Sequence, residues 1–234
     1  MRRSVVAWVA CVAGVLLVSV PAGAADVMAP KAGFVEASSY RWYLELRAGA
    51  PIQQDYDVVV GGGIGAGEYR PATGWHAAIA GGVQFSPNWR AELHVSYSNG
   101  QDGDLRLTAG GAPIPHSGNV NVYTISVDGI YTFTTLSPHF QPFIGAGVGV
   151  AIYELRNHGA VGGAFVSHGS DTTPVLGLHL GVDVPLGRVV TATARYTLAH
   201  TGSLSFNSIP AGIVTTRGST IDHIFSAGLR VFLN

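Results

Sequence analysis

The chain has 234 residues and contains only one cysteine, Cys11. This residue lies inside an apolar N-terminal run that we interpret as part of a signal peptide, so processing removes it. It also lacks the Leu and small-residue context of a lipoprotein cleavage site, which argues against a lipid anchor. The mature chain then has no thiol and no disulfide, and hydrogen bonds and packing alone must hold its fold.

Charge is scarce as well. The sequence has 13 basic and 14 acidic residues, and charged residues make up 12% of it, against about 25% in an ordinary soluble domain. Removal of Arg2 and Arg3 with the signal peptide leaves 11 basic against 14 acidic residues. The basic residues form no stripe of the kind that binds nucleic acid, and we exclude that function.

Long apolar runs are missing beyond the N-terminus. The run from Val5 to Val20 is short for a spanning helix, which needs about 20 apolar residues. It follows Arg2 and Arg3 and precedes Ala22-Gly23-Ala24, a small-residue cleavage pattern, as a secretory signal peptide does. The sequence therefore predicts three parts: a signal peptide over 1–24, a periplasmic leader over 25–40 and an outer-membrane domain over 41–234.

Alternation of apolar and polar residues is abundant instead. Because successive side chains of a strand point to opposite sides, a period of two gives each strand one apolar and one polar face. In 220–234, Ile221, Phe225 and Leu229 share a face, and Asp222 and Arg230 lie on the other. An amphipathic segment of about 10 residues suits a tilted strand that crosses a bilayer. Eight segments alternate in this way: 41–50, 74–86, 88–99, 119–134, 139–153, 172–184, 188–200 and 220–233.

The connections between these segments alternate in length. Short turns contain Ser86-Pro87, Leu136-Ser137-Pro138 and Pro185-Leu186-Gly187. Long, glycine-rich connections, which we expect to be mobile loops, cover 51–73, 100–118, 154–171 and 201–219. Short turns on one side and long loops on the other are typical of outer-membrane barrels. The sequence predicts an all-β fold, an eight-stranded antiparallel up-and-down transmembrane β-barrel with periplasmic turns and extracellular loops.

Alternation alone does not say which face points outward, since a soluble barrel would have its apolar face inside. Three features favour an apolar exterior in contact with lipid: the low charge, the small residues on the polar face, and aromatic residues near strand ends. Such aromatics form girdles at the two membrane interfaces. The interface aromatics that we predict are Trp42, Trp75, Phe85, Trp89, Tyr97, Tyr123, Phe133 and Phe140.

The predicted inner wall carries acidic and basic residues in equal number. An eight-stranded barrel is only wide enough for its own side chains, and an isolated charge in such a space is costly. We therefore expect these residues to neutralise one another in a network that blocks flow, and we do not expect a wide diffusion pore. The predicted lumen network contains Glu45, Arg47, Arg90, Glu92, Asp128, Asp183, Arg195 and Arg230.

Several segments carry a family resemblance: the opening Trp42-Tyr43-Leu44, the strand Phe143 to Gly149 and the closing Gly228 to Leu233. With them the chain resembles small outer-membrane β-barrel proteins of the opacity-protein or alphaproteobacterial surface-antigen type, over about 40–234. The resemblance implies a monomer with outer-membrane lipid, lipopolysaccharide and the barrel-assembly machinery as partners, and extracellular ligands or host surfaces at its loops. Such barrels usually end on an aromatic residue, whereas this chain ends on Asn234, two residues after Phe232.

Two patterns invite a chemical interpretation. His94 and Ser96, with Glu92 nearby, resemble the base and nucleophile of outer-membrane lipid A deacylases, but their parity points them into the barrel. The second pattern is a set of histidines without paired ligand spacing: His116, His158, His168 and His200. The cluster Gly61 to Gly65 lacks the Lys-Ser/Thr of a phosphate loop. We predict no catalytic residue, no cofactor and no metal site.

The sequence thus predicts a Gram-negative outer-membrane protein with a structural, envelope-integrity or surface-interaction role through four long loops. A narrow or gated porin-like channel for small solutes is the alternative. A lipid-modifying enzyme is a more remote one.

Overall fold

The computed structural model describes residues 40–60, 65–71, 74–107, 114–137, 139–160, 166–209 and 213–233. These residues all belong to one compact unit, Ser38–Asn234. The predicted signal peptide and all of the predicted leader except Tyr40 lie outside the described residues, as does Asn234. No helix in the described ranges has both the length and the apolar character that crossing a membrane requires.

Every regular element of the described residues is a β-strand. The strands are β1 (Arg41–Gln53), β2 (Tyr56–Val60), β3 (Gly65–Pro71), β4 (Trp75–Gln84), β5 (Trp89–Leu107), β6 (Ile114–Thr132), β7 (Gln141–Ala160), β8 (Val166–Pro185), β9 (Val190–Thr201), β10 (Leu204–Ile209), β11 (Ile213–Arg217) and β12 (Thr220–Phe232).

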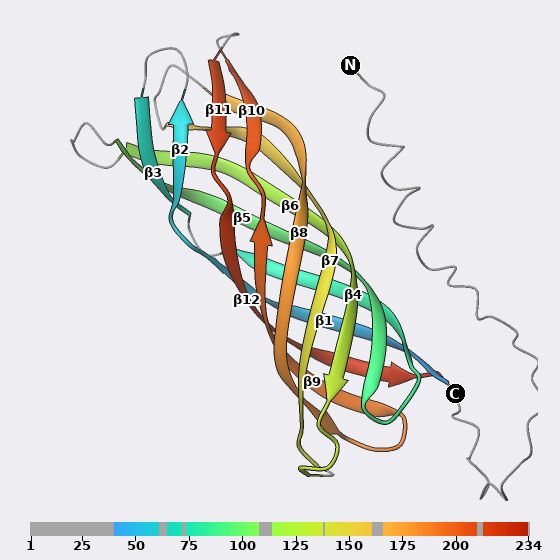
Figure 1. Ribbon diagram of the computed structural model, residues 1–234. Coiled ribbons are helices and arrows are strands. Elements are labelled where there is room, and N and C mark those ends of the chain that lie inside the picture. Colours follow the sequence, from blue (N-terminus) through green and yellow to red (C-terminus); the bar gives the residue numbers. More distant parts are fainter. Residues whose placement is uncertain are drawn as a thin grey trace, which may run out of the picture. The chain divides into compact units, whose positions relative to one another are not determined.

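Eight of these strands close into an antiparallel barrel (Figure 1). The order around the barrel is β1-β4-β5-β6-β7-β8-β9-β12, and β12 pairs with β1 to complete it. At the closing edge the backbone N–H of Leu233 donates to the carbonyl of Trp42 at 2.8 Å. The predicted fold class, an eight-stranded up-and-down barrel, is confirmed.

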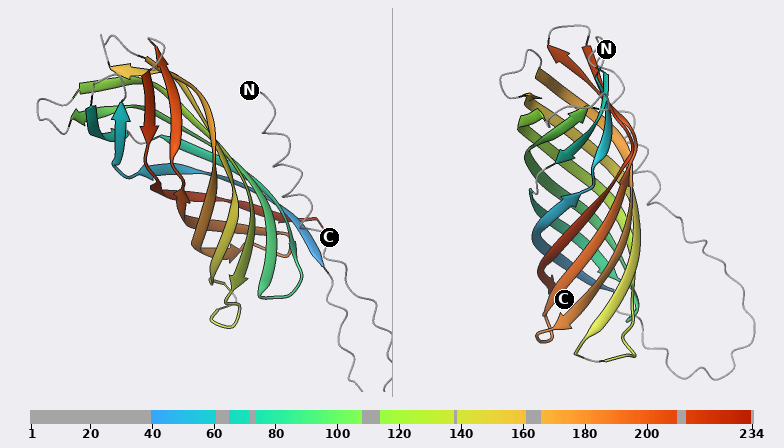
Figure 2. Two further views of the ribbon diagram at one scale, coloured as in Figure 1. Left: turned by 45° about the horizontal axis from the view of Figure 1, so that its top comes forward. Right: turned by 90° about the vertical axis from the view of Figure 1, so that its left-hand side faces the viewer.

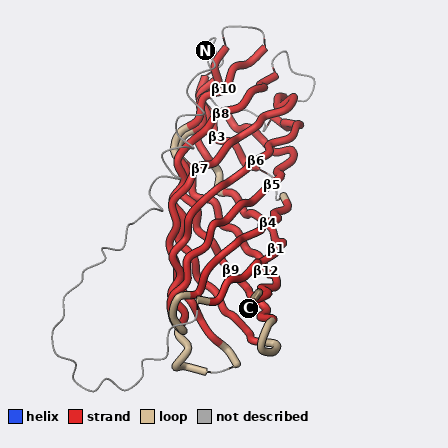
Figure 3. The backbone as a smooth tube through the Cα atoms, turned by 90° about the vertical axis from the view of Figure 1, so that its right-hand side faces the viewer, coloured by secondary structure: helices blue, strands red, loops and turns tan. Residues whose placement is uncertain are grey.

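The remaining four strands continue the barrel past the end of this first ring. β2 pairs with β3 and β11, β10 pairs with β11 and β8, and β3 pairs with β5. They extend β1, β4, β9 and β12 in the same neighbour order, while β5 to β8 run through both levels (Figures 2 and 3). We call the first ring the turn-side barrel. The ring of β2, β3, β10, β11 and the adjoining ends of β5 to β8 is the loop-side barrel.

The prediction that four long connections are loops is wrong for most of their described residues. The connections 51–73, 100–118, 154–171 and 201–219 consist largely of strand, because period-two alternation continues through their glycine-rich sequence, as in Leu204, Ser205 and Phe206. Their tips, 61–64, 108–113, 161–165 and 210–212, lie outside the described residues. Elsewhere the strand ends agree with the prediction within about three residues.

The two barrels have opposite polarity. In the turn-side barrel Leu46 is 62% exposed on the outside, while Glu45 is fully buried inside, so the predicted apolar exterior is confirmed there. In the loop-side barrel Tyr69 is buried inside, and Glu68 and Asp104 are exposed outside. The first pattern suits a wall in hydrocarbon and the second a wall in water.

The junction between the two barrels is irregular. The ladder between β8 and β9 begins at Val175, and the ladder between β8 and β10 ends at His168, so described pairing on this side of β8 skips 169–174. The carboxylate of Asp171 spans the interruption and accepts the backbone N–H of Ser205 at 2.8 Å. Gly169 has a φ of 132°. Residues with a side chain rarely adopt this backbone conformation, so glycine is favoured at this position.

Candidate functional site

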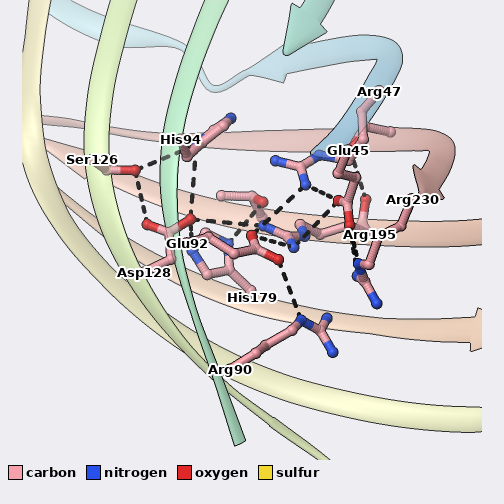
Figure 4. A network of polar contacts seen from close by, with 12 residues as sticks. Glu45, Arg47, Arg90, Glu92, His94, Ser126, Asp128, His179, Arg195 and Arg230 are labelled. Carbon is pink, nitrogen blue, oxygen red and sulfur yellow. Dashed lines mark hydrogen bonds and ion pairs between the residues drawn. The ribbon is translucent and has the colours of Figure 1, made fainter. Parts of the chain in front are cut away.

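The charged residues of the inner wall meet inside the turn-side barrel. They come from β1, β5, β6, β8, β9 and β12, and none is more than 5% exposed. Strand alternation points all of them inward, and the closed ring brings strands from both ends of the chain around one narrow bore. The structure brings together all eight predicted residues: Glu45, Arg47, Arg90, Glu92, Asp128, Asp183, Arg195 and Arg230. All of them except Asp183 are labelled in Figure 4.

Six of them form a closed circuit of alternating charge, which we call the ion-pair ring: Glu45, Arg230, Asp183, Arg90, Glu92 and Arg195. Arg230 lies 2.6 Å from Glu45 and 2.8 Å from Asp183. Arg90 lies 3.0 Å from Asp183 and 3.2 Å from Glu92. Arg195 lies 2.8 Å from Glu92 and 3.5 Å from Glu45, and closes the ring. Each ionised group therefore has an opposite charge on both sides, as burial requires.

The other two predicted residues attach to the ring. Arg47 pairs with Glu45 and lies 4.0 Å from Glu92. The carboxylate of Asp128 lies 3.7 Å from Arg195 and accepts the hydroxyl hydrogen of Ser126 at 2.8 Å.

Two histidines also contact Asp128. His179 Nε2 lies 3.3 Å from its carboxylate and His94 Nδ1 lies 3.8 Å from it. His94 also contacts the hydroxyl of Ser126 at 3.3 Å. Parity was right to place His94 and Ser96 inside the barrel, where both are buried. The contacts of His94 and the position of Glu92 in the ion-pair ring are those of a packed polar network.

Sequence reasoning missed five residues of the network. Tyr43 donates its hydroxyl to Glu92 at 2.8 Å, and Thr132 accepts from Arg90 at 2.6 Å. The guanidinium of Arg90 lies 4.8 Å from the ring centre of Phe143, a favourable cation–π distance. The other two are Ser126 and His179, which both contact Asp128. Strand alternation could have identified these residues, because Tyr43, for example, lies on the same inward face as Glu45. Tyr43 was missed because an aromatic side chain is not expected on a mostly polar face.

A small glycine-lined space admits Tyr43. A Cβ on Gly82 would lie 2.3 Å from the Tyr43 ring, so a larger residue would displace the tyrosine.

An apolar cluster is buried inside the barrel near the junction. It consists of Val122, Ala151, Tyr153, Val175, Ala199, Leu204 and Phe206. Buried polar residues such as Asn121 and Asp222 lie beside it, and the Tyr153 hydroxyl donates to Asp222 at 3.5 Å. Between this apolar cluster and the charge network lies a cavity of about 50 Å³, whose lining includes His94, Asp128 and Tyr153. That volume has room for one or two water molecules.

The sequence predicted no metal site and no cofactor, and the structure describes only part of the histidines on which that prediction rests. His116, His158 and His168 lie in β6, β7 and β8, and their side chains lie outside the described residues; His200 is exposed in β9. Within the described part of the chain, no group of three or more His, Cys, Asp or Glu residues could hold a metal ion.

The predicted interface aromatics lie in two groups on the outer wall. Near the junction, Tyr97 contacts Trp75 and Tyr123 with ring centres 5.0 and 5.1 Å apart. Near the turns, Tyr131 contacts Trp89 and Phe133 at 5.0 Å each. Trp42, Phe85 and Phe140 are exposed. Their place at the two membrane interfaces stays a prediction.

Comparison with known proteins finds one matching family and several similar solved structures. Residues 10–221 match the family described as outer membrane protein beta-barrel domain. No curated protein matches the chain. Among solved structures, the outer membrane protein OprG from Pseudomonas aeruginosa is 15% identical, with 80% of this chain and 95% of OprG covered and a TM-score of 0.55, which shows the fold.

Two further structures are similar in part. Neisserial surface protein A (NspA) is 22% identical, with 81% of this chain and 96% of NspA covered and a TM-score of 0.48. The outer membrane protease OmpT from Escherichia coli is 7% identical, with 82% of this chain and 97% of OmpT covered and a TM-score of 0.47.

Proposed function

The chain belongs to the outer membrane protein beta-barrel domain family, and from that premise we propose that it is a closed surface barrel without transport or catalytic activity. Its role is structural and surface-interacting. The turn-side barrel sits in the outer membrane, the turns face the periplasm, and the loop-side barrel projects from the cell. Its partners are outer-membrane lipid, lipopolysaccharide and the assembly machinery, and it acts as a monomer.

The observation that carries this proposal is the ion-pair ring. Opening the bore means separating buried charges, and removal of one partner from a buried pair costs about 3–5 kcal/mol. Arg195 contacts Glu45, Glu92 and Asp128, so its displacement would weaken the pairing of three buried carboxylates at once. The apolar cluster lies on the other side of the small cavity from the charge network.

Conductance tests the closed state. Mature protein refolded into planar bilayers is expected to give no steady unitary currents, with insertion checked by the temperature-dependent gel mobility of a folded barrel. Steady unitary currents from inserted wild-type protein would contradict the proposal and establish a channel. The cavity beside His94 and Asp128 is the observation that favours a narrow channel as the second candidate.

The orientation rests on the exterior of the loop-side barrel. Asp57, Glu68 and Asp104 are exposed there, and charged residues on a lipid-facing wall are costly. Epitope tags near residues 63, 111, 163 and 211 are expected to be accessible on intact cells. Tags at Ser137 or Gly187 are expected to be accessible only after the outer membrane is opened. The reverse pattern would overturn the orientation.

The absence of catalytic activity rests on the same closed lumen. His94, Ser96 and Glu92 are all buried, and the cavity beside them has room only for about one or two water molecules. A lipid substrate cannot reach them from the bilayer.

A further inference from the structure

The outer wall of the turn-side barrel is hollowed across β6 to β9. Two adjoining hollows of about 510 and 570 Å³ share Ala146, Leu178 and Leu198 in their linings. We call the two together the wall groove.

The floor and rims of the wall groove follow from strand register. Gly129 pairs with Ala146, which pairs with Leu178, so the two smallest side chains of this row lie side by side. The neighbouring rows are larger: Val148 is 61% exposed on one side and Ile144 is 47% exposed on the other. A shallow furrow bounded by branched aliphatic side chains results.

Both ends of the wall groove differ from its apolar middle. Trp89 and Tyr131 line the end near the turns, and His200 lines the end near the junction. His200 is exposed and pairs across the ladder with Leu176, which is also exposed. An imidazole N–H is a good donor to a phosphate oxygen, whereas it gains nothing from hydrocarbon.

This combination fits an amphiphile with an anionic head. We propose that the wall groove binds one acyl chain of a lipid A molecule, with a lipid A phosphate at His200. The proposal rests on the proposed function, because the junction must face the outer leaflet for lipid A to reach it.

A second copy of the chain is a poorer occupant. Exposed aliphatic residues surround the whole turn-side barrel, among them Leu44, Leu93 and Leu229 on other strands, so no face is set apart for a protein partner. The furrow has the width of a missing row of side chains, which is the scale of an acyl chain.

The test counts lipid on matched variants purified from outer membranes in mild detergent. Gly129→Leu fills the floor, and a Cβ at this position meets nothing within 4 Å, so the barrel accommodates it. Gly81→Leu is the control: Gly81 also faces outward, and its Cβ would meet only Leu44 at 3.8 Å. Ala146→Phe is a second filling variant. Folding is checked by gel mobility.

We expect one lipid A per wild-type and Gly81→Leu barrel in native mass spectrometry. Gly129→Leu and Ala146→Phe should lower retention by about tenfold, the change that ~1.4 kcal/mol of lost affinity produces. His200→Ala should weaken binding of added lipid A, whereas Gly81→Leu should leave it unchanged. Equal lipid A retention in all variants, preference for phosphatidylglycerol, or dimers in place of lipid would each overturn the proposal.

The outcomes separate this proposal from the proposed function. Lipid counts do not depend on whether the bore conducts, so unitary currents would overturn the closed state and leave the wall groove standing. Tags that are accessible in the reverse pattern would instead overturn the orientation, and with it the choice of lipid A.

Discussion

The turn-side and loop-side barrels are formed by the same eight strand paths around the barrel, yet the polarity of their inner and outer faces is reversed. The turn-side barrel exposes Leu46 and buries Glu45, whereas the loop-side barrel exposes Glu68 and buries Tyr69. Strand geometry is the same in both, since the neighbour order continues from β1 and β4 into β2 and β3. This difference is the one expected between a wall in hydrocarbon and a wall in water.

The two lumens are stable for different reasons. In the turn-side barrel the interior consists of charges, and each is tolerated only because opposite charges surround it. In the loop-side barrel the buried side chains include Tyr69, Leu204 and Phe206, which gain stability from burial and close packing. The same kind of substitution should therefore have different effects at the two levels.

The largest effect is expected in the ion-pair ring. Arg90→Ala leaves Glu92 and Asp183 each without one cationic neighbour, and should lower the free energy of unfolding in bilayers by about 3–5 kcal/mol. The double variant Arg90→Ala/Glu92→Ala should cost less than the sum of the two single changes, because the charges are then removed as a pair. Urea titration of refolded protein measures both, and additive losses would show that the ring is not coupled.

The next effect compares the two outer walls. Leu93→Arg places a charge on the turn-side exterior and should cost about 2–4 kcal/mol if that position lies at the bilayer midplane. Thr216→Arg places the same charge on the loop-side exterior and should change stability by no more than about 0.5 kcal/mol. Equal costs at the two positions would show that both walls face the same medium.

A smaller effect is expected inside the apolar cluster. Leu204 is only 1% exposed, and Leu204→Ala should destabilise the protein by about 2 kcal/mol through lost burial and a residual cavity. The control Ser205→Ala changes the neighbouring outward side chain and should have almost no effect. If Leu204→Ala leaves both thermal stability and protease resistance unchanged, the cluster does not support the loop-side barrel.

The smallest effect is expected at the junction. Asp171→Ala removes the carboxylate that accepts the Ser205 N–H at 2.8 Å and the Thr172 N–H at 2.8 Å, and should cost about 1 kcal/mol. Amide hydrogen exchange should quicken at Ser205 and stay unchanged in the turn-side part of β9. If exchange quickened equally along β9 and β10, the two barrels would open as one unit rather than separately.

Much of this architecture can be read from local pattern. Alternation is a property of single strands, so the eight amphipathic segments, their inward and outward faces and the eight charged members of the network follow from residue order alone. The short turns follow from Pro and Gly. The same reasoning went wrong at 51–73 and the other long connections, where glycine-rich sequence concealed strands with alternating residues.

Which lumen residues pair with each other depends on how the strands are arranged around the closed barrel, and no single segment of the sequence determines that arrangement. Arg230 donates to Glu45, 185 positions away along the chain, because closure of the barrel makes β12 and β1 neighbours. The tilt and stagger of closure place side chains of β1, β5, β8, β9 and β12 at one level of the bore. Alternation indicates that these residues face inward, and the register of the closed sheet selects which carboxylate each guanidinium meets. The strands that continue past the junction bury apolar residues such as Tyr69 and Phe206, on the other side of the junction from the charges.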